Sequence, residues 1–312
     1  MRKTSAALAT LSLAVLALTG CAAAPTFSGA SCDRTASASG IDEAVTVEGE
    51  VGEEPQVEVF SPVHVKKTSF TDLAIGDGRA VVTGQQAMNL ELSIYSGETG
   101  KQVFATGYDP KAAAPAMSID DWAERSPGLG DVLKCVTAES RVLAALTPED
   151  FGPANLEGLG LADDDTAIFV IDVVDAFLPK AEGALQFNDA RGLPTVVRAA
   201  DGTPGIIIPD TAAPEKQTVQ TLIKGDGEPL TAEQTPLVNF TAIGWDDKQI
   251  LQTTWGDKPS AQLRDIAAPV ADALVGQPVG SQVMVVLPAA GEGSPAIAVV
   301  VDVLGVTAAP TQ

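Results

Sequence analysis

The arrangement of apolar and polar residues along the chain predicts mostly strands. In LELSIY (90–95) apolar and polar residues alternate, which is typical of a strand with one face on a core and one face near water. TAIFVIDVVDAF (166–177) and PAIAVVVDVLGV (295–306) are nearly continuous apolar runs, as expected of central strands. An aspartate interrupts each run, Asp172 in the first and Asp302 in the second, and we expect these carboxylates to face solvent or to be hydrogen-bonded.

The same order of elements occurs twice along the chain. The matching pairs are ESRVLAALTPEDFG (139–152) with GSQVMVVLPAAGEG (280–293), the two apolar runs with each other, NLELSIYSGETGKQVFATGY (89–108) with VNFTAIGWDDKQILQTTW (238–255), and SPGLGDVLK (126–134) with APVADALVG (268–276). The repeat length of roughly 140 residues is well above the roughly 20–50 residues of solenoid repeats. We therefore expect a duplicated domain.

Short helices are predicted between the strands of each copy. Ser118 could cap a helix over Ser118–Arg125, and Asp120 and Asp121 would favour its first turn. A second helix is expected around Ala267–Leu274. Each copy is thus predicted to be α+β, with an antiparallel sheet and a short helix against it.

Composition divides the chain into six segments. Small and polar residues precede the first copy, and LPKAEGALQFNDARG (178–192) combines Pro, Gly and charged residues that interrupt the apolar pattern. The predicted segments are a signal peptide at 1–20, a lipidated flexible tether at 21–42, a first domain at 43–178, a linker at 179–192, a second domain at 193–306 and a tail at 307–312.

The N-terminus has the pattern of an export signal. Arg2 and Lys3 precede an apolar run at 6–18, which is shorter than the about 20 residues that a membrane-spanning helix needs. LTGC (18–21) resembles the bacterial lipobox, in which the cysteine is lipidated and becomes the mature N-terminus. We expect an exported protein anchored to the outer face of the cell membrane through lipidated Cys21. The alternative is ordinary cleavage that leaves Cys21 as a free thiol.

Two further cysteines, Cys32 and Cys135, could pair, because the compartment of an exported protein tolerates disulfides. The sequence leaves a disulfide and two free thiols as equal alternatives. No spacing of Cys and His residues indicates zinc, and no acidic loop of the calcium-binding type occurs. We therefore expect neither a metal nor a cofactor.

The chain is strongly acidic, with 41 Asp and Glu residues, 19 Lys and Arg residues and a formal net charge of −22. This charge disfavours nucleic acids and anionic lipid headgroups as partners. Membrane contact is therefore expected through the lipid anchor only.

The order of hairpin, short helix, strand, proline loop and apolar strand resembles the FKBP-type (macrolide-binding immunophilin) peptidyl-prolyl cis-trans isomerases. The segments that carry the resemblance are VNFTAIGWDDKQILQTTW, ADALVGQPVGSQV, LPAAGEG and AIAVVVDVL in the second copy, and LELSIYSGETGKQVFATGY, SPGLGDVLKCVTAESRV, LTPEDFG and TAIFVIDVV in the first. They cover most of residues 80–178 and 236–306. The resemblance implies two tandem half-barrels, each an antiparallel sheet wrapped on a short helix, with an aromatic-lined pocket between helix and sheet. It also implies proline-containing exported polypeptides as substrates.

The resemblance assigns pocket positions to particular residues. In the first copy the candidates for the catalytic pocket are Tyr95, Phe104, Phe151 and Phe169. In the second copy the substrate-binding candidates are Phe240, Leu251, Gln252, Trp255, Val270 and Val299. The pocket acid of the family falls at Ala105 and Gln252, and its pocket-floor tryptophan falls at Leu129 and Val270, so both copies lack these two groups. For the aromatic residues the alternative is a plain core position.

Isomerisation of an X–Pro bond needs no nucleophile and no metal. Its barrier of about 18–20 kcal/mol comes from amide resonance, and an apolar pocket that removes water from the carbonyl favours the twisted state. We therefore expect a weak, lipid-anchored prolyl isomerase that helps exported proteins fold, or a non-catalytic surface lipoprotein that binds peptide or protein. A spacer without a ligand is a third alternative, because one fold serves many functions.

Overall fold

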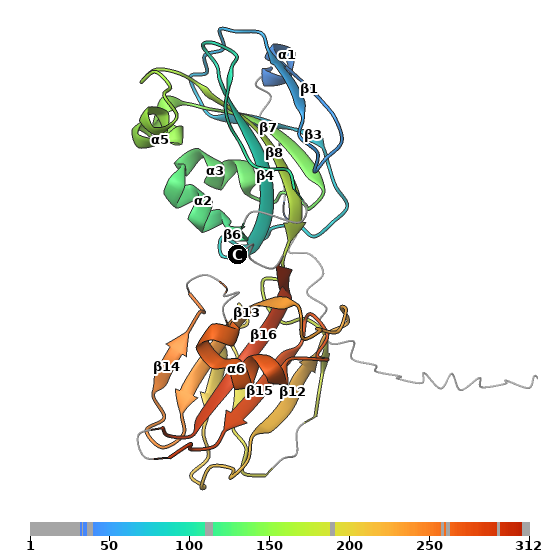
Figure 1. The fold of residues 1–312 in the computed structure, drawn as a ribbon, viewed down its shortest axis with the longest axis vertical. Helices are drawn as coiled ribbons and strands as arrows, with labels where there is room; N and C mark the ends of the chain where they lie inside the picture. Colours follow the sequence, from blue (N-terminus) through green and yellow to red (C-terminus); the bar gives the residue numbers. More distant parts are fainter. Residues whose placement is uncertain are drawn as a thin grey trace, which may run out of the picture.

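The computed structural model describes residues 32, 34–35, 40–109, 115–187, 191–256, 259, 263–291 and 294–307. The predicted signal peptide, the predicted lipidation site Cys21, most of the predicted tether and residues 308–312 lie outside the described residues. The described part is rich in strands, most of which belong to two large antiparallel sheets. Figure 1 shows one sheet in the upper part of the molecule and the other in the lower part.

The first sheet is formed by residues of the predicted first copy. Its strands lie in the order β3–β7–β8–β4–β5, and β6 pairs with the first residues of β4. These strands are β3 (Ser69–Ala74), β4 (Ala87–Ser96), β5 (Gln102–Ala105), β6 (Met117–Ser118), β7 (Ser140–Leu146) and β8 (Ala167–Ala176). The apolar run at 166–177 thus forms the middle strand, which pairs with β7 on one side and β4 on the other.

The second sheet has the order β14–β13–β16–β15–β12–β9. These strands are β9 (Ala184–Leu185), β12 (Thr218–Lys224), β13 (Thr235–Gly244), β14 (Ile250–Thr253), β15 (Gln282–Leu287) and β16 (Ile297–Thr307). Its first five strands follow the same sequence-order pattern as β5–β4–β8–β7–β3 of the first sheet. The matching sequence segments therefore occupy corresponding strands in the two sheets.

The edge strand β9 lies inside the predicted linker at 179–192. Ala184 and Leu185 are opposite Lys224 and Ile223 of β12, so this part of the chain belongs to the second sheet. A strand of two residues is too short to show a period, and the Pro, Gly and charged residues around it dominate the sequence pattern there.

Short helices cover one face of the first sheet. The predicted helix is confirmed as α2 (Ile119–Arg125), where Ser118 Oγ accepts a hydrogen bond from Asp121 N and the Asp121 carboxylate accepts one from Ser118 N. Three further helices each begin at a proline, whose fixed φ suits the first helical position. They are α3 (Pro127–Leu133), α4 (Pro148–Phe151) and α5 (Pro153–Gly158). The predicted proline loop after β7 is therefore largely helical.

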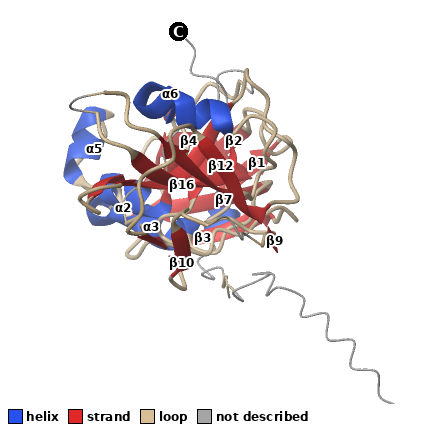
Figure 2. Cartoon of the chain, turned by 90° about the horizontal axis from the view of Figure 1, so that it is seen from below, coloured by secondary structure: helices blue, strands red, loops and turns tan. Residues whose placement is uncertain are grey.

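The second sheet is covered by α6 (Leu263–Ala273), which is kinked at Ala267 and contains Pro269. It begins earlier than the predicted helix at Ala267–Leu274, and Leu263 is part of the core beneath it. Figure 2 shows the helices, in blue, at the periphery of the strands. None of the helices in the described part of the chain is long and apolar enough to cross a membrane.

A two-stranded ribbon covers the opposite face of each sheet. β1 (Val45–Glu48) and β2 (Gln56–Val59), preceded by α1 (Ile41–Ala44), pack on the first sheet. β10 (Thr195–Arg198) and β11 (Pro204–Ile207) pack on the second. Each sheet is therefore the middle of three layers, where the sequence predicts a sheet wrapped on one helix. The alternation in β4 consequently does not mark a wet face, and all 10 of its residues are buried.

The two sheets are joined by an apolar contact at the ends of β8 and β16. Phe177 and Leu178 follow β8 and cluster with Leu237 and Leu304 of the second sheet. The N–H of Leu178 donates to the carbonyl of Leu304 at 3.1 Å. The ring of Phe177 lies so close to Gly305 that a Cβ there would come within 2.4 Å of it. The contact therefore requires glycine at this position of β16.

Cys32 and Cys135 form a disulfide, with their Cα atoms 5.3 Å apart. The bond joins residues that are 103 positions apart in the sequence. The bond fixes the segment before the first sheet to the residue that follows Lys134 at the end of α3. Of the two alternatives that the sequence leaves open, a disulfide and two free thiols, the structure has the disulfide.

Candidate functional site

Phe151 and Phe169 are the two aromatic pocket candidates of the first copy that lie together. Their ring centroids are 5.4 Å apart with the planes at 75°, an edge-to-face contact. Leu129 of α3, at the position where the resemblance implies a tryptophan, belongs to the same core. Phe151 is 4% exposed, Phe169 2% and Leu129 2%, so side chains fill the space between helices and sheet at this point.

Tyr95 and Phe104 lie apart from this pair. Ile94 faces the helices, and successive residues of a strand point to opposite faces, so Tyr95 points to the ribbon side and packs near Val45. Phe104 lies on the edge strand β5 and is 43% exposed. The four aromatic rings therefore do not line a single pocket.

The candidates of the second copy divide in a similar way. Phe240, Val270 and Val299 are buried together in the core beneath α6. Leu251 and Gln252 lie outside this core on β14, a strand at the sheet edge whose residues are all exposed. The helix side of the second sheet is thus filled at the corresponding place.

Trp255 follows β14 and is half-buried. A Cβ on Gly202 would lie 3.1 Å from its ring, which places the indole against the turn between β10 and β11. Among the described residues its buried Nε1 has no hydrogen-bond partner. Trp255 therefore packs on the ribbon side and does not border the core beneath α6.

A buried ion pair lies on the ribbon side of the first sheet, between Arg141 of β7 and Asp172 of β8. Nε and Nη2 of Arg141 each donate to one carboxylate oxygen of Asp172 at 2.6 Å, a bidentate arrangement. The guanidinium also donates to three backbone carbonyls in the turn between β1 and β2. Asp172 in turn accepts a hydrogen bond from the N–H of Gly52 in that turn at 2.7 Å. The ion pair thus fastens the ribbon to the sheet.

Sequence reasoning missed Arg141 as the partner of Asp172. The sequence does hold a signal for this pairing. Arg141 is the third residue of ESRV (139–142) and corresponds to Gln282, the third residue of GSQV (280–283) in the second copy. These two residues occupy corresponding places beside Asp172 and Asp302.

Asp302 is held by a different set of groups. It accepts hydrogen bonds from the N–H of Ala181 at 2.8 Å and from Nε2 of Gln282 at 2.7 Å. Arg198 donates to Oε1 of Gln282 at 2.7 Å, so its hydrogen bond reaches the glutamine and not the carboxylate. Burial raises the pKa of Asp302 from 3.8 to about 6, and the two hydrogen bonds and nearby cations only partly oppose this shift.

We expect Asp302→Asn to flatten the pH dependence of stability between about pH 4 and 6. The pKa is raised in the folded state, so the native carboxyl contributes stability that is complete below 3.8 and is lost as the pH rises through about 6. Asparagine does not ionise, so the variant should gain stability relative to the native chain over this range. Urea unfolding of both proteins at about pH 4.5 and about pH 7.5 measures the difference. Parallel pH profiles for the two proteins would contradict the assignment.

In the described part of the chain, no group of three or more His, Cys, Asp or Glu side chains is placed to bind a metal ion.

Solved structures with FKBP domains resemble this chain at low sequence identity. Neither a protein-family model nor a curated protein sequence matches it. Among solved structures, the three FKBP domains of wheat FKBP73 are 12% identical with a TM-score of 0.34, over 77% of this chain and 94% of that chain. A peptidyl-prolyl cis-trans isomerase from Pseudomonas syringae pv. tomato is 12% identical with a TM-score of 0.29, over 35% of this chain and 74% of that chain. FkpA from Escherichia coli is 18% identical with a TM-score of 0.29, over 35% of this chain and 47% of that chain. Similarity at this level establishes neither a family nor an activity.

Proposed function

We propose that this chain is an exported, lipid-anchored protein of two divergent FKBP-like domains that binds segments of exported polypeptides and has little or no prolyl isomerase activity. The observation that carries the proposal is the filled interior of the first sheet, where Leu129, Phe151 and Phe169 are all buried in one core. A prolyl ring would need that space.

The FKBP-like part of the proposal rests on the sequence segments and on where they lie. SPGLGDVLK forms α3, the first six residues of APVADALVG (268–273) form the second half of α6, and each helix covers the helix side of its sheet. The segments that match across the two copies also form corresponding strands. A duplicated FKBP-like unit accounts for both facts.

The filled interior argues against efficient catalysis. An isomerase must bind the twisted amide better than the planar one, and it does so by holding the prolyl group in an apolar, water-free hollow. In the first sheet Phe151 and Phe169 occupy this space themselves, and in the second sheet Phe240 and Val299 do. The positions of the pocket acid, Ala105 and Gln252, carry no carboxylate.

Binding of polypeptide is supported by apolar side chains on the outer strands. Ile250 and Leu251 are exposed on β14, and Phe104 is exposed on β5. Both strands are the last in their sheets among the described residues, so an extended segment could pair with their backbone and place apolar side chains next to these residues. The acidic surface favours segments that carry positive charge.

Export and anchoring are supported by the N-terminal sequence, in which a basic start and a short apolar run lead to LTGC. The disulfide between Cys32 and Cys135 is consistent with an oxidising compartment outside the cytoplasm. Proline-containing exported polypeptides are the proposed partners, and the lipid on Cys21 is the proposed membrane contact.

The full chain should accelerate the isomerisation of a proline tetrapeptide by less than about twofold in a protease-coupled assay, since buried side chains fill the expected prolyl position in the described part of each sheet. An active FKBP-type isomerase in the same assay is the positive control. Acceleration of about tenfold or more would show that the interior does admit substrate and would overturn the catalytic part of the proposal.

The binding part is tested with reduced, carbamidomethylated lysozyme, an unfolded polypeptide that is basic and has no free thiols, because the acidic chain should favour a positively charged partner. We expect a measurable affinity for the full chain, and a weaker one for Leu251→Lys/Ile250→Lys, because charge on β14 would oppose strand pairing. A chain that neither binds this polypeptide nor accelerates the tetrapeptide is a spacer.

A further inference from the structure

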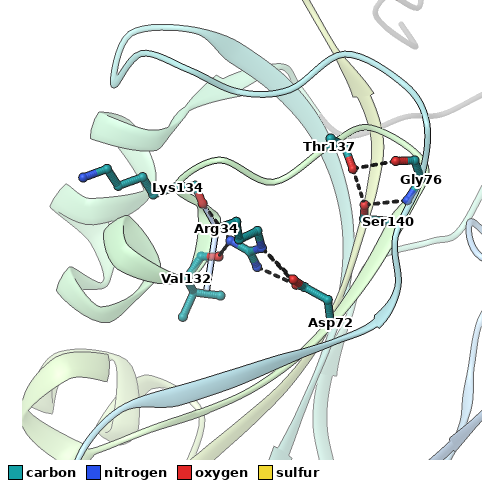
Figure 3. Close-up of polar contacts among 7 residues, drawn as sticks. All are labelled: Arg34, Asp72, Gly76, Val132, Lys134, Thr137 and Ser140. Atoms are coloured by element: carbon teal, nitrogen blue, oxygen red, sulfur yellow. Dashed lines mark hydrogen bonds and ion pairs between the residues drawn. The ribbon is translucent and has the colours of Figure 1, made fainter. Parts of the chain in front are cut away.

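Arg34 lies before the first sheet in the sequence but is hydrogen-bonded to β3 of that sheet and to the end of α3. Its Nε donates to both carboxylate oxygens of Asp72 on β3, at 3.0 and 2.9 Å, and Nη2 donates to Oδ1 at 2.7 Å. Its Nη1 donates to the carbonyls of Val132 and Lys134 at 2.7 Å. Figure 3 shows the guanidinium between the carboxylate and these two carbonyls. The same group lies over the ring of Phe70, 4.4 Å from its centroid.

The two carbonyls are at the C-terminal end of α3. The last carbonyls of a helix have no hydrogen-bond partner within the helix. A cation near them also interacts favourably with the negative end of the helix dipole. The last turn of α3 contains no basic residue of its own. Arg34 therefore acts as the C-terminal cap of α3 from a position about 100 residues earlier in the chain.

The disulfide strengthens the same attachment. Cys135 directly follows Lys134, whose carbonyl Arg34 binds, and Cys32 is two positions before Arg34. One short segment is thus joined to the end of α3 by a covalent bond and by hydrogen bonds. We call Cys32 and Arg34, with their bonds to Asp72, α3 and Cys135, the clasp.

The helix held by the clasp closes the interior of the first sheet. α3 has only 7 residues, and a helix of this length depends on packing for its stability. It contributes Leu129, Val132 and Leu133 to the core that contains Phe151 and Phe169. Movement of α3 would therefore uncover apolar surface at the place where an FKBP-like domain would hold its ligand.

We propose that the clasp is a releasable lock on α3, and that reduction of the Cys32–Cys135 disulfide by a dithiol lets α3 move and opens the first sheet to an apolar polypeptide segment. The proposal rests on the proposed function for the identity of the ligand. In the reduction the S–S bond breaks, Cys32 and Cys135 become thiols, and the dithiol loses two electrons and two protons as it becomes a disulfide. Arg34 remains as the second attachment, so release is complete only when its hydrogen bonds also break.

The position of the clasp permits this chemistry. Cys32 is partly exposed, whereas Cys135 is buried with 8% of its surface exposed. A surface hollow is lined by their neighbours in the sequence, among them Arg34 and Lys134, with Thr35, Phe70 and Asp131. We therefore expect a dithiol to attack the bond at the partly exposed Cys32.

The second sheet supplies an internal control. Its helix α6 carries an ion pair between Arg264 and Asp272, but both side chains belong to α6 itself and are exposed. No disulfide reaches α6 among the described residues. Release of the clasp should therefore change α3 and leave α6 unchanged.

Hydrogen exchange read by mass spectrometry on the full chain tests the lock. We compare the native protein, the native protein with dithiothreitol, Arg34→Gln, Cys32→Ser/Cys135→Ser and the triple variant. In the triple variant the amides at 128–134 should exchange at least about tenfold faster than in the native protein, with smaller increases in the other three samples. Those of α6 and β13 should change by less than about twofold.

Arg79→Gln is the matched control, because it removes a partly exposed arginine whose ion pair with Glu182 spans 3.6 Å and does not touch α3. It should leave exchange at 128–134 as in the native chain. Unchanged exchange at 128–134 in the native protein with dithiothreitol, or in the triple variant, would overturn the proposal. So would an equal increase in both sheets, since that would show global destabilisation and not the release of one helix.

Binding of reduced, carbamidomethylated lysozyme separates the lock from the proposed function. The edge strands are available in both states, but the interior is available only in the open fraction of molecules, so release should raise the apparent affinity by about tenfold or more. Equal affinity of the native chain and the triple variant would contradict the lock but not polypeptide binding. Absence of binding in both would contradict the proposed function, and the exchange rates would still decide whether the clasp holds α3.

Discussion

Replacing Arg141 by methionine should lower the free energy of unfolding by about 3–5 kcal/mol. The substitution keeps most of the side-chain volume but leaves the carboxylate of Asp172 buried without its bidentate partner. It also leaves three carbonyls of the β1–β2 turn without the N–H groups that they accept from. Burial of an unpaired charge is the main cause of the loss, and detachment of the ribbon adds to it.

Urea unfolding followed by circular dichroism measures this change. Arg79→Met is the control: it removes an arginine from a partly exposed ion pair and should change stability by less than about 1 kcal/mol. Arg141→Met/Asp172→Leu should recover part of the loss, because no charge is then left buried. A single variant as stable as the native chain would mean that the ion pair does not hold the ribbon.

Replacing Phe177 by alanine should also lower the free energy of unfolding by about 3–5 kcal/mol, as is usual for a buried phenylalanine. Phe177 fills the contact between the two sheets and lies against Gly305 of β16. Its loss should therefore weaken the coupling between the sheets as well as overall stability. We expect the unfolding curve to change from one transition to two, since each sheet has its own core.

Phe187→Ala is the matched control for this prediction. Phe187 is 90% exposed, so the same change of residue should alter stability by less than about 0.5 kcal/mol. Gly305→Val should reproduce the effect of Phe177→Ala from the other side of the contact, because its side chain would occupy the place of the ring. If both variants unfold in one unshifted transition, the sheets are not coupled through this contact.

Strand positions could be predicted from the sequence where the pattern is long and regular. The runs at 166–177 and 295–306 became the middle strands β8 and β16, because nearly continuous apolar runs rich in β-branched residues suit a strand that is buried on both faces. Ser118 as the cap, with Asp120 and Asp121 in the first turn, predicted α2 for an equally local reason. The equal strand order of the two sheets follows from the matched segments.

The layers on the ribbon side could not be predicted in the same way. β1 and β2 are short and contain Glu48 and Glu58, so they lack the apolar pattern that marks a core strand. Tyr95 is buried on the ribbon side because of the face of β4 on which it lies. A shift of one residue in matching this strand to the family pattern would place the residue on the opposite face. For this reason Tyr95 does not share a pocket with Phe151 and Phe169.

Pairing between distant residues was the other limit. Asp172 was noticed because it interrupts an apolar run, but its partner Arg141 is 31 residues away on another strand. The sequence shows both Cys32 and Cys135, but nothing in it predicts that residues 103 positions apart form a disulfide. Arg34 gives no local signal at all, because its role depends on the end of a helix that is close to it only in the folded chain.

The strand β9 bears on how the chain can be divided for experiments. A second half that begins after the sequence-based linker, at residue 193, would lack Ala184 and Leu185 and would leave Ile223 and Lys224 of β12 without their partners. It would also lack Ala181, whose N–H binds the buried carboxylate of Asp302. A usable second-half fragment should therefore begin before Ala181, and a first-half fragment that ends near Leu178 needs a polar replacement for the apolar surface that it exposes. Residues on both sides of the boundary contact each other in the folded chain, so the boundary is an interface and not a linker between two independent parts.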